Sequence, residues 1–591
     1  MQQTRKTPNT LARTRIWYVL ILLLSAVVLV RVFHLQVIQH DYYKTAAEAG
    51  QMREYEIPAS RGVIEAHNGD SVVPLVLNES RYIVFVDPLH IEDIDDAAEQ
   101  LVSVLGAQDK AEVEQKMAAD NRYQVIQRNV TKTVVENIEE LELPGVGIRE
   151  EPQRTYPHGS LAAHILGFVN NDGEGVYGIE QALDDELVGT PGQLRAVTDT
   201  RGIPLAANPE NTLIEPQEGR RTRLTIDVSL QRQLEDALEH GLERARSESG
   251  GALVIDANSG AIKAMANYPT FDPSRFYEVS NDESDVFANR LVTSPMEIGS
   301  IMKPLTLAAA LNEGAVRRDT TYYDPDRFTV DGATIRNVEE SSGVGERNME
   351  DILRLSLNTG ATWLLKQMGG GDEINETART TWHHYMTERF FFDKPTGIEQ
   401  GYEVAGDIPD PFDGYGLNIQ YANTAFGQGM TTTPLHAAAA LSAVINQGTY
   451  YQPRLVDAQS DNEGAMQPKD PVAVRKDVVS PSVSADIRRL MEGAFAQNYR
   501  SYGLNNLRTG FTIGGKTGTA EVPHPEGGYY EDRFNGTFFG YVSGDDSTYV
   551  IMVRVDEPRI GGYAGSTAAG PIFVDIATTL IDSFGMQPRV N

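Results

Sequence analysis

Cysteine is absent from the 591 residues of the sequence. Its absence excludes a disulfide bond, a thiolate metal site, a catalytic thiol and a lipidated N-terminal cysteine. A chain without cysteine is compatible with an oxidising exterior, although the redox compartment stays open. Internal repeats and low-complexity tracts are also absent. At this length, the sequence therefore predicts two to four ordinary domains.

Basic residues are scarce in relation to acidic ones. The sequence has 51 Lys and Arg against 83 Asp and Glu, a formal net charge of −32. Five basic residues fall within the first 34 positions, which contain no acid, so 46 basic and 83 acidic residues remain, a charge of −37. A surface of that charge argues against binding to nucleic acid, whose phosphates need positive partners.

Long hydrophobic runs are absent with one exception, IWYVLILLLSAVVLVRVFHLQVI at residues 16–38. This run is long enough to span a bilayer. Because basic residues precede it, we expect residues 1–15 to stay in the cytoplasm and the bulk of the chain to lie outside the cell membrane. The alternative is a signal peptide cleaved at the small residues 47–49, but these lie well beyond a run that is itself long for a signal core. We therefore expect an uncleaved, single-pass anchor.

The stretch MEIGSIMKPLTLAAAL, residues 296–311, predicts a helix with a serine and a lysine near its start. At a spacing of three, Ser300 and Lys303 lie on the same helix face. A buried lysine tends to lose its proton, and a neutral amine beside a hydroxyl is a general base beside a nucleophile. The pattern alone is weak, because a capped helix with a lysine that reaches to water has the same spacing.

Two further motifs follow in the same part of the chain. Ser356 and Asn358, in SLN, sit where one predicted helix stops and the next begins, and alone they indicate a capping pair. Lys516 lies in GGKTGT, a strand pattern whose glycines permit close approach of another chain. In this order and within one domain, the three motifs form the signature of serine acyltransferases that penicillin acylates. The sequence therefore predicts that Lys303 takes the proton of Ser300.

Strand patterns at both ends of the C-terminal region predict an α+β domain. A sheet assembled from the two ends of a domain, with helices inserted between them, is an α+β arrangement. Upstream, glycine-rich segments and short apolar runs predict an elongated, irregular module. The patterns are a strand–turn–strand at 56–73, helices at 93–106 and 109–120, a hairpin at 251–268, strands at 511–522, 536–543 and 548–555, and a helix at 571–585.

Across its whole length the chain resembles the class B penicillin-binding proteins, which are peptidoglycan D,D-transpeptidases. The pieces that carry the resemblance are RGVIEAHNG, AAHILGFVNNDGEGVYGIEQALDDELVGTPG, TIDVSLQ, ANYPTFDP, EIGSIMKP, SLNTGA, AFGQGMTTTPLHAAAA and GGKTGTAEVP. The segment GEGVYGIEQALDDELVG and the absence of long insertions make the chain resemble the septal cell-division branch of the family. The alternative is the elongation branch, which acts on the lateral wall.

The resemblance implies a penicillin-binding, serine transpeptidase fold of the α+β class, with an antiparallel sheet and helices on both faces. An elongated α+β pedestal and one N-terminal transmembrane helix precede it. The sequence shows no glycosyltransferase module before the pedestal, so glycan polymerisation is expected from a partner. The implied domains are a cytoplasmic tail at 1–15, an anchor at 16–38, a dimerisation or pedestal domain at 39–223 and a transpeptidase domain at 224–586.

The resemblance also implies the roles in acylation. Ser300 attacks the carbonyl of a D-Ala–D-Ala stem peptide, with Lys303 as the general base. Ser356 relays a proton to the leaving amine, while Asn358 binds the donor backbone and holds Lys303. An amine of a second stem peptide then attacks the acyl-enzyme and forms the crosslink.

The remaining implied residues bind the substrate. Lys516 and Thr517 bind the substrate carboxylate, which β-lactams mimic. Lys516 is also one of the implied catalytic residues. Gly518 and Thr519 complete the substrate-binding strand. The backbone N–H groups of Ser300 and Thr519 form the oxyanion hole.

No metal or organic cofactor is implied, and no ligand cluster is recognisable in the sequence. The implied partners are the stem peptides that serve as donor and as amine acceptor, β-lactams, a membrane-embedded glycan polymerase and other division proteins. Nucleic acid is not among them.

Three departures from the family pattern stand out. Ile298 occupies a position that is often proline, which is expected to loosen the entry to the catalytic helix slightly. Ala66 and His67 replace the usual Asp–Arg before the asparagine–glycine turn, and they concern the pedestal. Glu521 replaces the glutamine common after KTGTA, which bears on how acyl donors are held.

Three alternatives stay open beside the transpeptidase. A class A β-lactamase needs a deacylating glutamate in ExxLN, but the later Leu417–Asn418 has Gly414 in the glutamate position. A membrane β-lactam sensor places a signalling domain or several spans before the site, whereas this N-terminal tail is about 15 residues. A non-enzymatic penicillin-binding scaffold has no physical need to retain Ser300, Lys303 and Lys516 together.

Overall fold

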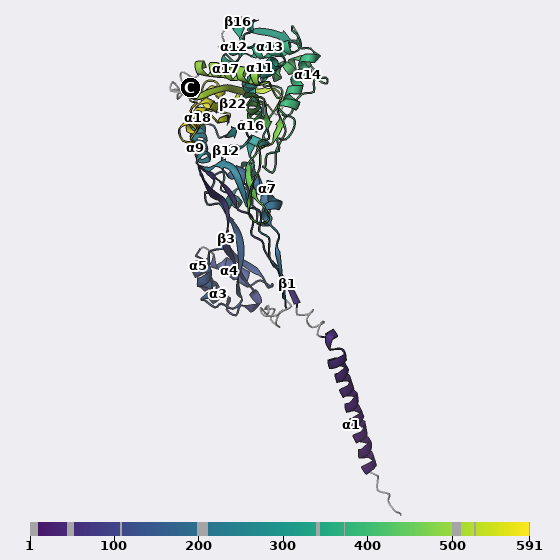
Figure 1. Ribbon diagram of the computed structural model, residues 1–591. Coiled ribbons are helices and arrows are strands. Elements are labelled where there is room, and N and C mark those ends of the chain that lie inside the picture. The colour runs from purple at the N-terminus through teal and green to yellow at the C-terminus, as the bar shows by residue number, and fades with distance from the viewer. Residues whose placement is uncertain are drawn as a thin grey trace, which may run out of the picture. The chain divides into compact units, whose positions relative to one another are not determined.

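The structure is a computed structural model that describes residues 10–43, 52–106, 109–197, 211–337, 343–371, 373–498, 510–524 and 527–589 (Figure 1). The chain forms two compact units. The first comprises Met1–Ser60 and Gly189–Glu218, and the second comprises Arg61–Val188 and Gly219–Asn591. Every residue predicted for the active site falls in the second unit.

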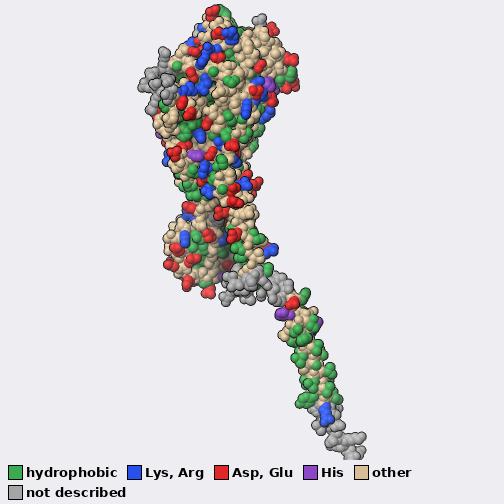
Figure 2. Space-filling view, viewed as in Figure 1, with side chains coloured by type: hydrophobic (Ala, Val, Ile, Leu, Met, Phe, Trp, Pro, Cys, Tyr) green, Lys and Arg blue, Asp and Glu red, His purple; other side chains and the backbone are tan. Residues whose placement is uncertain are grey.

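An apolar helix and a small sheet make up the described part of the first unit. Helix α1, Thr10–Phe33, continues as the π-helical turn η1, His34–Ile38. Within the described residues, Arg15–Ile38 is the one segment long and apolar enough to cross a membrane, with a mean hydropathy of 2.6 and no buried part. Figure 2 shows hydrophobic side chains along it. The antiparallel sheet has the order β1 (Met52–Ile57), β8 (Gly192–Val197) and β9 (Thr212–Ile214).

A mixed sheet runs through the second unit in the order β19–β18–β10–β2–β3–β4, with β5 also paired to β3. The hairpin β2–β3 pairs Asn68 with Ser71, so its turn residues are Gly69 and Asp70, one position later than the predicted Asn68–Gly69. Gly69 has the positive φ of 61° that such turns favour. Helices α3, α4 and α5 bury one apolar cluster against β3 and β4. The bounds are β2 Ile64–Asn68, β3 Ser71–Val86, β4 Gln124–Val130, β5 Val146–Thr155, β10 Thr222–Asp227, β18 Val456–Ser460, β19 Met466–Pro468, α3 Ile94–Leu105, α4 Lys110–Met117 and α5 Lys132–Glu139.

A buried ionic cluster supports this part of the second unit. Glu180, on α7 (Gly178–Ala182), is 0% exposed. Its carboxylate contacts Arg61 Nε and Arg154 Nε, each at 2.7 Å. Arg61 also contacts Asp184 at 2.7 Å, and Arg154 donates to Asn78 at 2.8 Å. Charges this deep lose their hydration, so the cluster depends on each charge keeping its partner.

The C-terminal region contains the antiparallel sheet β12–β11–β23–β22–β21. Its two faces enter different cores, as alternation along a strand requires: Val550 and Met552 of β23 belong to the core that also contains residues of α11, α16 and α17, whereas Ile551 and Val553 belong to the core that contains residues of α9 and α18. The predicted α+β sheet with helices on both faces is confirmed. The bounds are β11 Ser249–Asp256, β12 Ile262–Tyr268, β21 Thr512–Pro523, β22 Tyr529–Ser543, β23 Thr548–Asp556, α9 Val228–Ala245, α11 Lys303–Asn312, α16 Pro434–Ile445, α17 Pro481–Asn498 and α18 Gly570–Asp582.

Two element boundaries differ from the sequence-based expectation. The helix expected from Ser300 begins with a 3₁₀ turn, η5 (Gly299–Met302), before α11. Pro304 has no N–H to reach the carbonyl of Ser300, which instead accepts from Lys303 N. Strand β22 begins at Tyr529 instead of 536, which lengthens the β21–β22 hairpin.

Shorter elements complete the second unit. Most of them lie between β12 and β21, where the sequence predicts helices and loops. They are α6 Ala163–Leu166, β6 Phe168–Val169, β7 Gly175–Val176, α8 Asp184–Val188, α10 Arg290–Thr293, β13 Thr321–Asp324, β14 Arg327–Val330, β15 Ala333–Arg336, β16 Gly345–Asn348, α12 Met349–Arg354, α13 Asn358–Met368, α14 Glu376–His384, α15 Leu417–Thr424, β17 Tyr450–Tyr451 and β20 Ala473–Arg475.

Candidate active site

Glycine backbones bring Ser300 close to strand β21. Gly299 has a φ of 61°, and a Cβ there would lie 2.8 Å from the carbonyl oxygen of Thr519. A Cβ on Gly427 would lie 2.1 Å from the carbonyl oxygen of Gly299. Side chains at these glycines would push the turn that carries Ser300 away from the strand, so the close approach requires glycine.

Lys303 is completely buried and stands at the centre of the predicted site. Its Nζ lies 2.8 Å from Ser300 Oγ and 2.8 Å from Asn358 Oδ1. Nζ also lies 3.0 Å from Ser356 Oγ and 2.6 Å from the carbonyl oxygen of Ser356. One amine therefore joins three of the residues that the first two motifs supply.

The partners of Nζ determine which proton arrangement the site can hold. The carbonyl oxygen of Ser356 and Oδ1 of Asn358 only accept, so each takes an N–H from Nζ. A neutral amine has two N–H groups and one lone pair, which those two bonds leave free for a hydroxyl proton. The adjacent hydroxyls belong to Ser300 and Ser356. The geometry thus suits proton transfer from a serine to Lys303.

The two lysines of the site both have depressed pKa values. Burial lowers the pKa of Lys303 well below its usual range, and the charge of Lys516 lowers that pKa further. Lys516 is 4% exposed, and burial lowers its pKa to about 7. Because two cations in one pocket repel, a charge on either lysine disfavours a charge on the other.

Strand β21 carries the third motif. Lys516 Nζ donates to the carbonyl oxygen of Thr517 at 2.8 Å and lies 3.3 Å from Thr517 Oγ1. A Cβ on Gly518 would lie 2.7 Å from the carbonyl oxygen of Ile298, so this glycine allows the strand to touch the nucleophile turn. Thr519 Oγ1 accepts from the N–H of Gly565 at 3.2 Å.

The loop with Ser356 and Asn358 holds an uncommon backbone conformation. Ser356 lies between α12 and α13 with a φ of 56°. A non-glycine residue in this region costs about 1–3 kcal/mol, and it persists only where its surroundings impose it. Here those surroundings include Lys303, which binds both the carbonyl and the hydroxyl of Ser356. Asn358 Nδ2 additionally donates to the carbonyl oxygen of Arg336 at 3.2 Å.

Asp324 supports this loop from behind, and sequence reasoning did not find it. The carboxylate on β13 is 0% exposed and accepts from Thr359 Oγ1 at 2.9 Å and from Asn337 Nδ2 at 3.3 Å. Asn337 Oδ1 accepts from Thr359 N at 3.1 Å. Because α13 begins at Asn358, these bonds fix the residue that contacts Lys303. Asp324 lies 35 residues before Thr359, and no local pattern in the sequence indicates that the two meet.

Glu297, three residues before Ser300, was also missed. Its Oε1 accepts from the N–H of Gly429 and from the hydroxyl of Tyr529, both at 2.8 Å. Its Oε2 is closed to solvent and has no partner within the described residues. Burial raises the pKa of Glu297, and the charge of Glu521 raises it further. The negative charges of Glu297 and Glu521 therefore repel each other, and Glu297 lies three residues before the predicted nucleophile Ser300.

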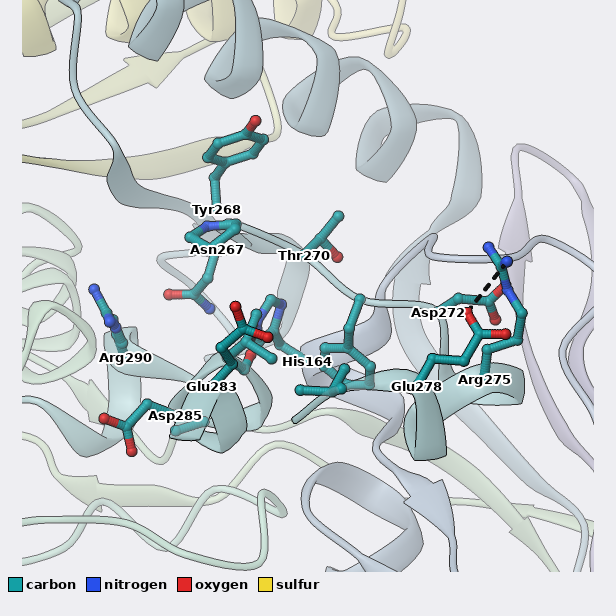
Figure 3. Close-up of a pocket in the computed structure, with 15 residues that line it drawn as sticks. His164, Asn267, Tyr268, Thr270, Asp272, Arg275, Glu278, Glu283, Asp285 and Arg290 are labelled. Atoms are coloured by element: carbon teal, nitrogen blue, oxygen red, sulfur yellow. Dashed lines mark hydrogen bonds and ion pairs between the residues drawn. The ribbon is translucent and has the colours of Figure 1, made fainter. Parts of the chain in front are cut away.

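A cavity of about 540 Å³ in the second unit contains none of the predicted site residues (Figure 3). His164 and residues between 267 and 290 line it. Burial lowers the pKa of His164 to about 4, so its ring is neutral, and Nε2 donates to the carbonyl oxygen of Val286 at 2.9 Å. Over the described ranges, no three acidic or histidine side chains are arranged to hold a metal ion.

Comparison with known protein families gives two matches. The penicillin binding protein transpeptidase domain matches residues 250–578, and the penicillin-binding protein dimerisation domain matches residues 56–224. The chain is 30% identical to the stage V sporulation protein D of Bacillus subtilis, over 99% of this chain and 88% of that protein. It is 26% identical to the peptidoglycan D,D-transpeptidase FtsI of Escherichia coli, over 96% of this chain and 91% of that protein.

Solved structures show the same fold. Penicillin binding protein 2X from Streptococcus thermophilus aligns with a TM-score of 0.70 at 22% identity, covering 91% of this chain and 83% of that one. Penicillin binding protein 3 from Mycobacterium tuberculosis, complexed with aztreonam, aligns with a TM-score of 0.66 at 24% identity, covering 91% of this chain and 100% of that one.

Proposed function

The chain belongs to the class B penicillin-binding proteins, serine-type D,D-transpeptidases of peptidoglycan, and from this premise we propose that Ser300 is its nucleophile. The contact of Lys303 Nζ with Ser300, Ser356 and Asn358 carries the proposal, because it places a completely buried amine, whose pKa burial lowers, against the hydroxyl of Ser300. Oxyanion stabilisation comes from the N–H groups of Ser300 and Thr519, which close backbone packing holds near one another.

The acylation step exchanges one amide for one ester. Ser300 Oγ attacks the carbonyl carbon of the penultimate D-Ala while Lys303 takes its proton. Ser356 Oγ, 3.0 Å from Nζ, passes that proton to the nitrogen of the terminal D-Ala as the amide bond breaks. Lys516 and Thr517 hold the departing residue's carboxylate. The product is an acyl-Ser300 ester and free D-Ala.

Crosslinking reverses these proton movements with a different amine. An amine of a second stem peptide attacks the ester carbonyl and gives a proton to Lys303. The tetrahedral intermediate collapses, the ester bond breaks, and Ser300 Oγ recovers a proton. A new amide joins the two peptides, and the reaction consumes no oxidant, reductant or metal.

Intact-mass analysis tests the nucleophile. We expect benzylpenicillin to add its full mass once to the whole chain in detergent, because a β-lactam ring has no leaving group to lose on acylation. The Ser300→Ala chain should show no addition, and Ser294→Ala, six residues upstream, should label as the parent does. An unshifted parent, or a shift that persists in Ser300→Ala, would contradict the assignment.

Noncovalent binding of a carboxylate ligand should weaken above pH 7. The empty site loses the proton of Lys516 at about pH 7, and the ligand carboxylate favours the charged lysine. Binding above that pH therefore requires uptake of a proton, and the dissociation constant should rise about tenfold per pH unit until the pKa of the complex is reached. Titration of the Ser300→Ala chain with benzylpenicillin measures this; a constant affinity up to about pH 9 would exclude Lys516 as the carboxylate's cation.

We further propose that the chain acts in septal wall synthesis and is inhibited by β-lactams. The septal-type sequence GEGVYGIEQALDDELVG and the lack of long insertions favour division over lateral elongation. Residues 16–38 anchor the chain, residues 1–15 stay in the cytoplasm, and 39–223 and 224–586 form the pedestal and transpeptidase domains. A membrane-embedded polymerase supplies the glycan, together with other division proteins.

Imaging of a fluorescent fusion in growing cells tests the septal proposal. Recruitment to midcell before constriction supports a division role. A dispersed signal along the lateral wall supports the elongation alternative and would overturn the septal assignment, without bearing on Ser300.

A further inference from the structure

Glu521 lies on the same strand and the same side as the residues proposed to hold the substrate. Along β21, positions 516, 518 and 520 are buried, while Thr517, Thr519 and Glu521 are partly exposed. This alternation is the period of two expected for a strand. Glu521 therefore lies on the same side of β21 as Thr517 and Thr519.

The position of Glu521 along β21 indicates which part of a donor peptide it meets. β21 is the terminal strand of its sheet, so the edge away from β22 has no strand neighbour within the described residues and can accept an extended peptide. The proposed function places the donor's carboxylate at Thr517 and its scissile carbonyl at Thr519. A strand advances about 3.3 Å per residue, so Glu521 lies about 6.6 Å farther on. An extended donor reaches this point with the residue that precedes D-Ala–D-Ala.

Glu521 has no cationic partner in the part of the chain that the structure describes. Across the ranges that the structure describes, its carboxylate makes no hydrogen bond or ion pair. Arg533, which belongs to the same hairpin, donates to the two carboxylate oxygens of Glu557 through Nε and Nη2. Glu297 adds a second negative group, and its own Oε2 lacks a partner. Among the described residues, no cation is thus paired with Glu521 or Glu297.

We propose that Glu521 binds an ammonium group on the side chain of the donor residue that precedes D-Ala–D-Ala. The inference rests on the proposed function and assigns Glu521 as a residue that determines donor specificity at that site. An ammonium ion gives Glu521 a charge-assisted hydrogen bond and relieves its repulsion by Glu297. A peptide whose amine has already been acylated in a crosslink lacks that charge. The site therefore selects donors that have not yet served as acceptors.

The test compares two synthetic donors that differ in one charge. Both are N-acetylated pentapeptides that end in D-Ala–D-Ala, one with lysine and one with Nε-acetyllysine at the third position. The readout is kcat/KM for release of D-Ala by the full chain in detergent, a step that involves no acceptor. We expect the parent to prefer the free amine by about tenfold or more, and Glu521→Gln to reduce that preference to about twofold or less.

Matched variants separate this role from a general defect. Glu531→Gln removes an exposed carboxylate from the same hairpin and should keep the parent's preference. Glu297→Gln should reduce the preference partly, because the negative charge of Glu297 attracts the donor's ammonium group without contacting it. Benzylpenicillin carries no ammonium group, so it should acylate Ser300 at the same rate in the Glu531→Gln chain as in the parent.

Two results would overturn the inference while the proposed function stands: a parent that acylates with penicillin but does not distinguish the donors, or a Glu521→Gln chain that retains the full preference. A parent that penicillin does not acylate would instead remove the proposed function and the inference with it. Added salt gives an independent readout, because a preference based on charge should shrink as ionic strength rises.

Discussion

Replacement of Lys303 by arginine is expected to slow acylation of Ser300 by benzylpenicillin at least about a hundredfold. Arginine is always protonated and has no lone pair to accept the serine's proton. In the parent, two acceptors use the two N–H groups of a neutral amine, which leaves its lone pair to a hydroxyl. A time course of labelling at fixed drug concentration measures the effect.

A second substitution keeps this experiment informative about mechanism. Arginine is larger than the completely buried lysine, and overpacking can cost about 1–3 kcal/mol. Lys303→Met has a similar volume without the amine, and it should lose acylation as well. The control Lys394→Arg changes a lysine that forms an exposed ion pair with Glu388, and penicillin should acylate this chain as it does the parent. If a folded Lys303→Arg chain acylates within about tenfold of the parent, a barrier change of about 1.4 kcal/mol, Lys303 is not the base.

Glu180→Gln should destabilise the second unit by about 3–5 kcal/mol, the usual cost of removing one partner from a buried ionic cluster. The substitution preserves the size of the side chain. It leaves Arg61 and Arg154, whose side chains are 10% and 6% exposed, without the carboxylate that both contact. Denaturant unfolding of the full chain in detergent, followed by loss of penicillin labelling, measures the change.

An exposed ion pair provides the control for burial. Glu79 contacts Arg81 at 2.7 Å, but the two side chains are 46% and 29% exposed. Glu79→Gln should therefore change the free energy of unfolding by less than about 1 kcal/mol. Equal effects from the two substitutions would mean that the cluster at Glu180 contributes no more than a surface pair.

The residues of the candidate site were predictable because each lies in a short motif with a fixed spacing. Ser300 and Lys303 are separated by one helical turn, so their proximity follows from local structure alone. Lys516 lies 216 residues after Ser300, and only the order of the three motifs indicated that they converge. The sheet was predictable from its alternating strands, such as β23, whose successive side chains enter different cores.

The supporting contacts were not predictable from one sequence. Asp324 is a carboxylate in an unremarkable stretch, and its bond to Thr359 depends on how β13 folds back beside α13. Gly427 belongs to a loop whose close contact with Gly299 appears only once both are placed. Strand β10, which contains the predicted domain limit at residue 223, pairs with β2 across a long sequence interval, while the limit itself stays a prediction. Nonlocal pairings of this kind leave little trace in local patterns.

The pairing of the first and last strands of the catalytic sheet has a consequence for biosynthesis. β11 lies between β12 and β23, and Ser249 bonds to Asp556, a residue 307 positions later. If the ribosome adds about 5–20 residues per second, β23 is synthesised roughly 15–60 s after β11, and the two strands cannot pair before then. The nucleophile turn is likewise made long before β21, so a nascent chain can hold Ser300 and Lys303 without an oxyanion hole. Penicillin reactivity should accordingly arise late and all at once, and chains released before residue 519 should never acquire it.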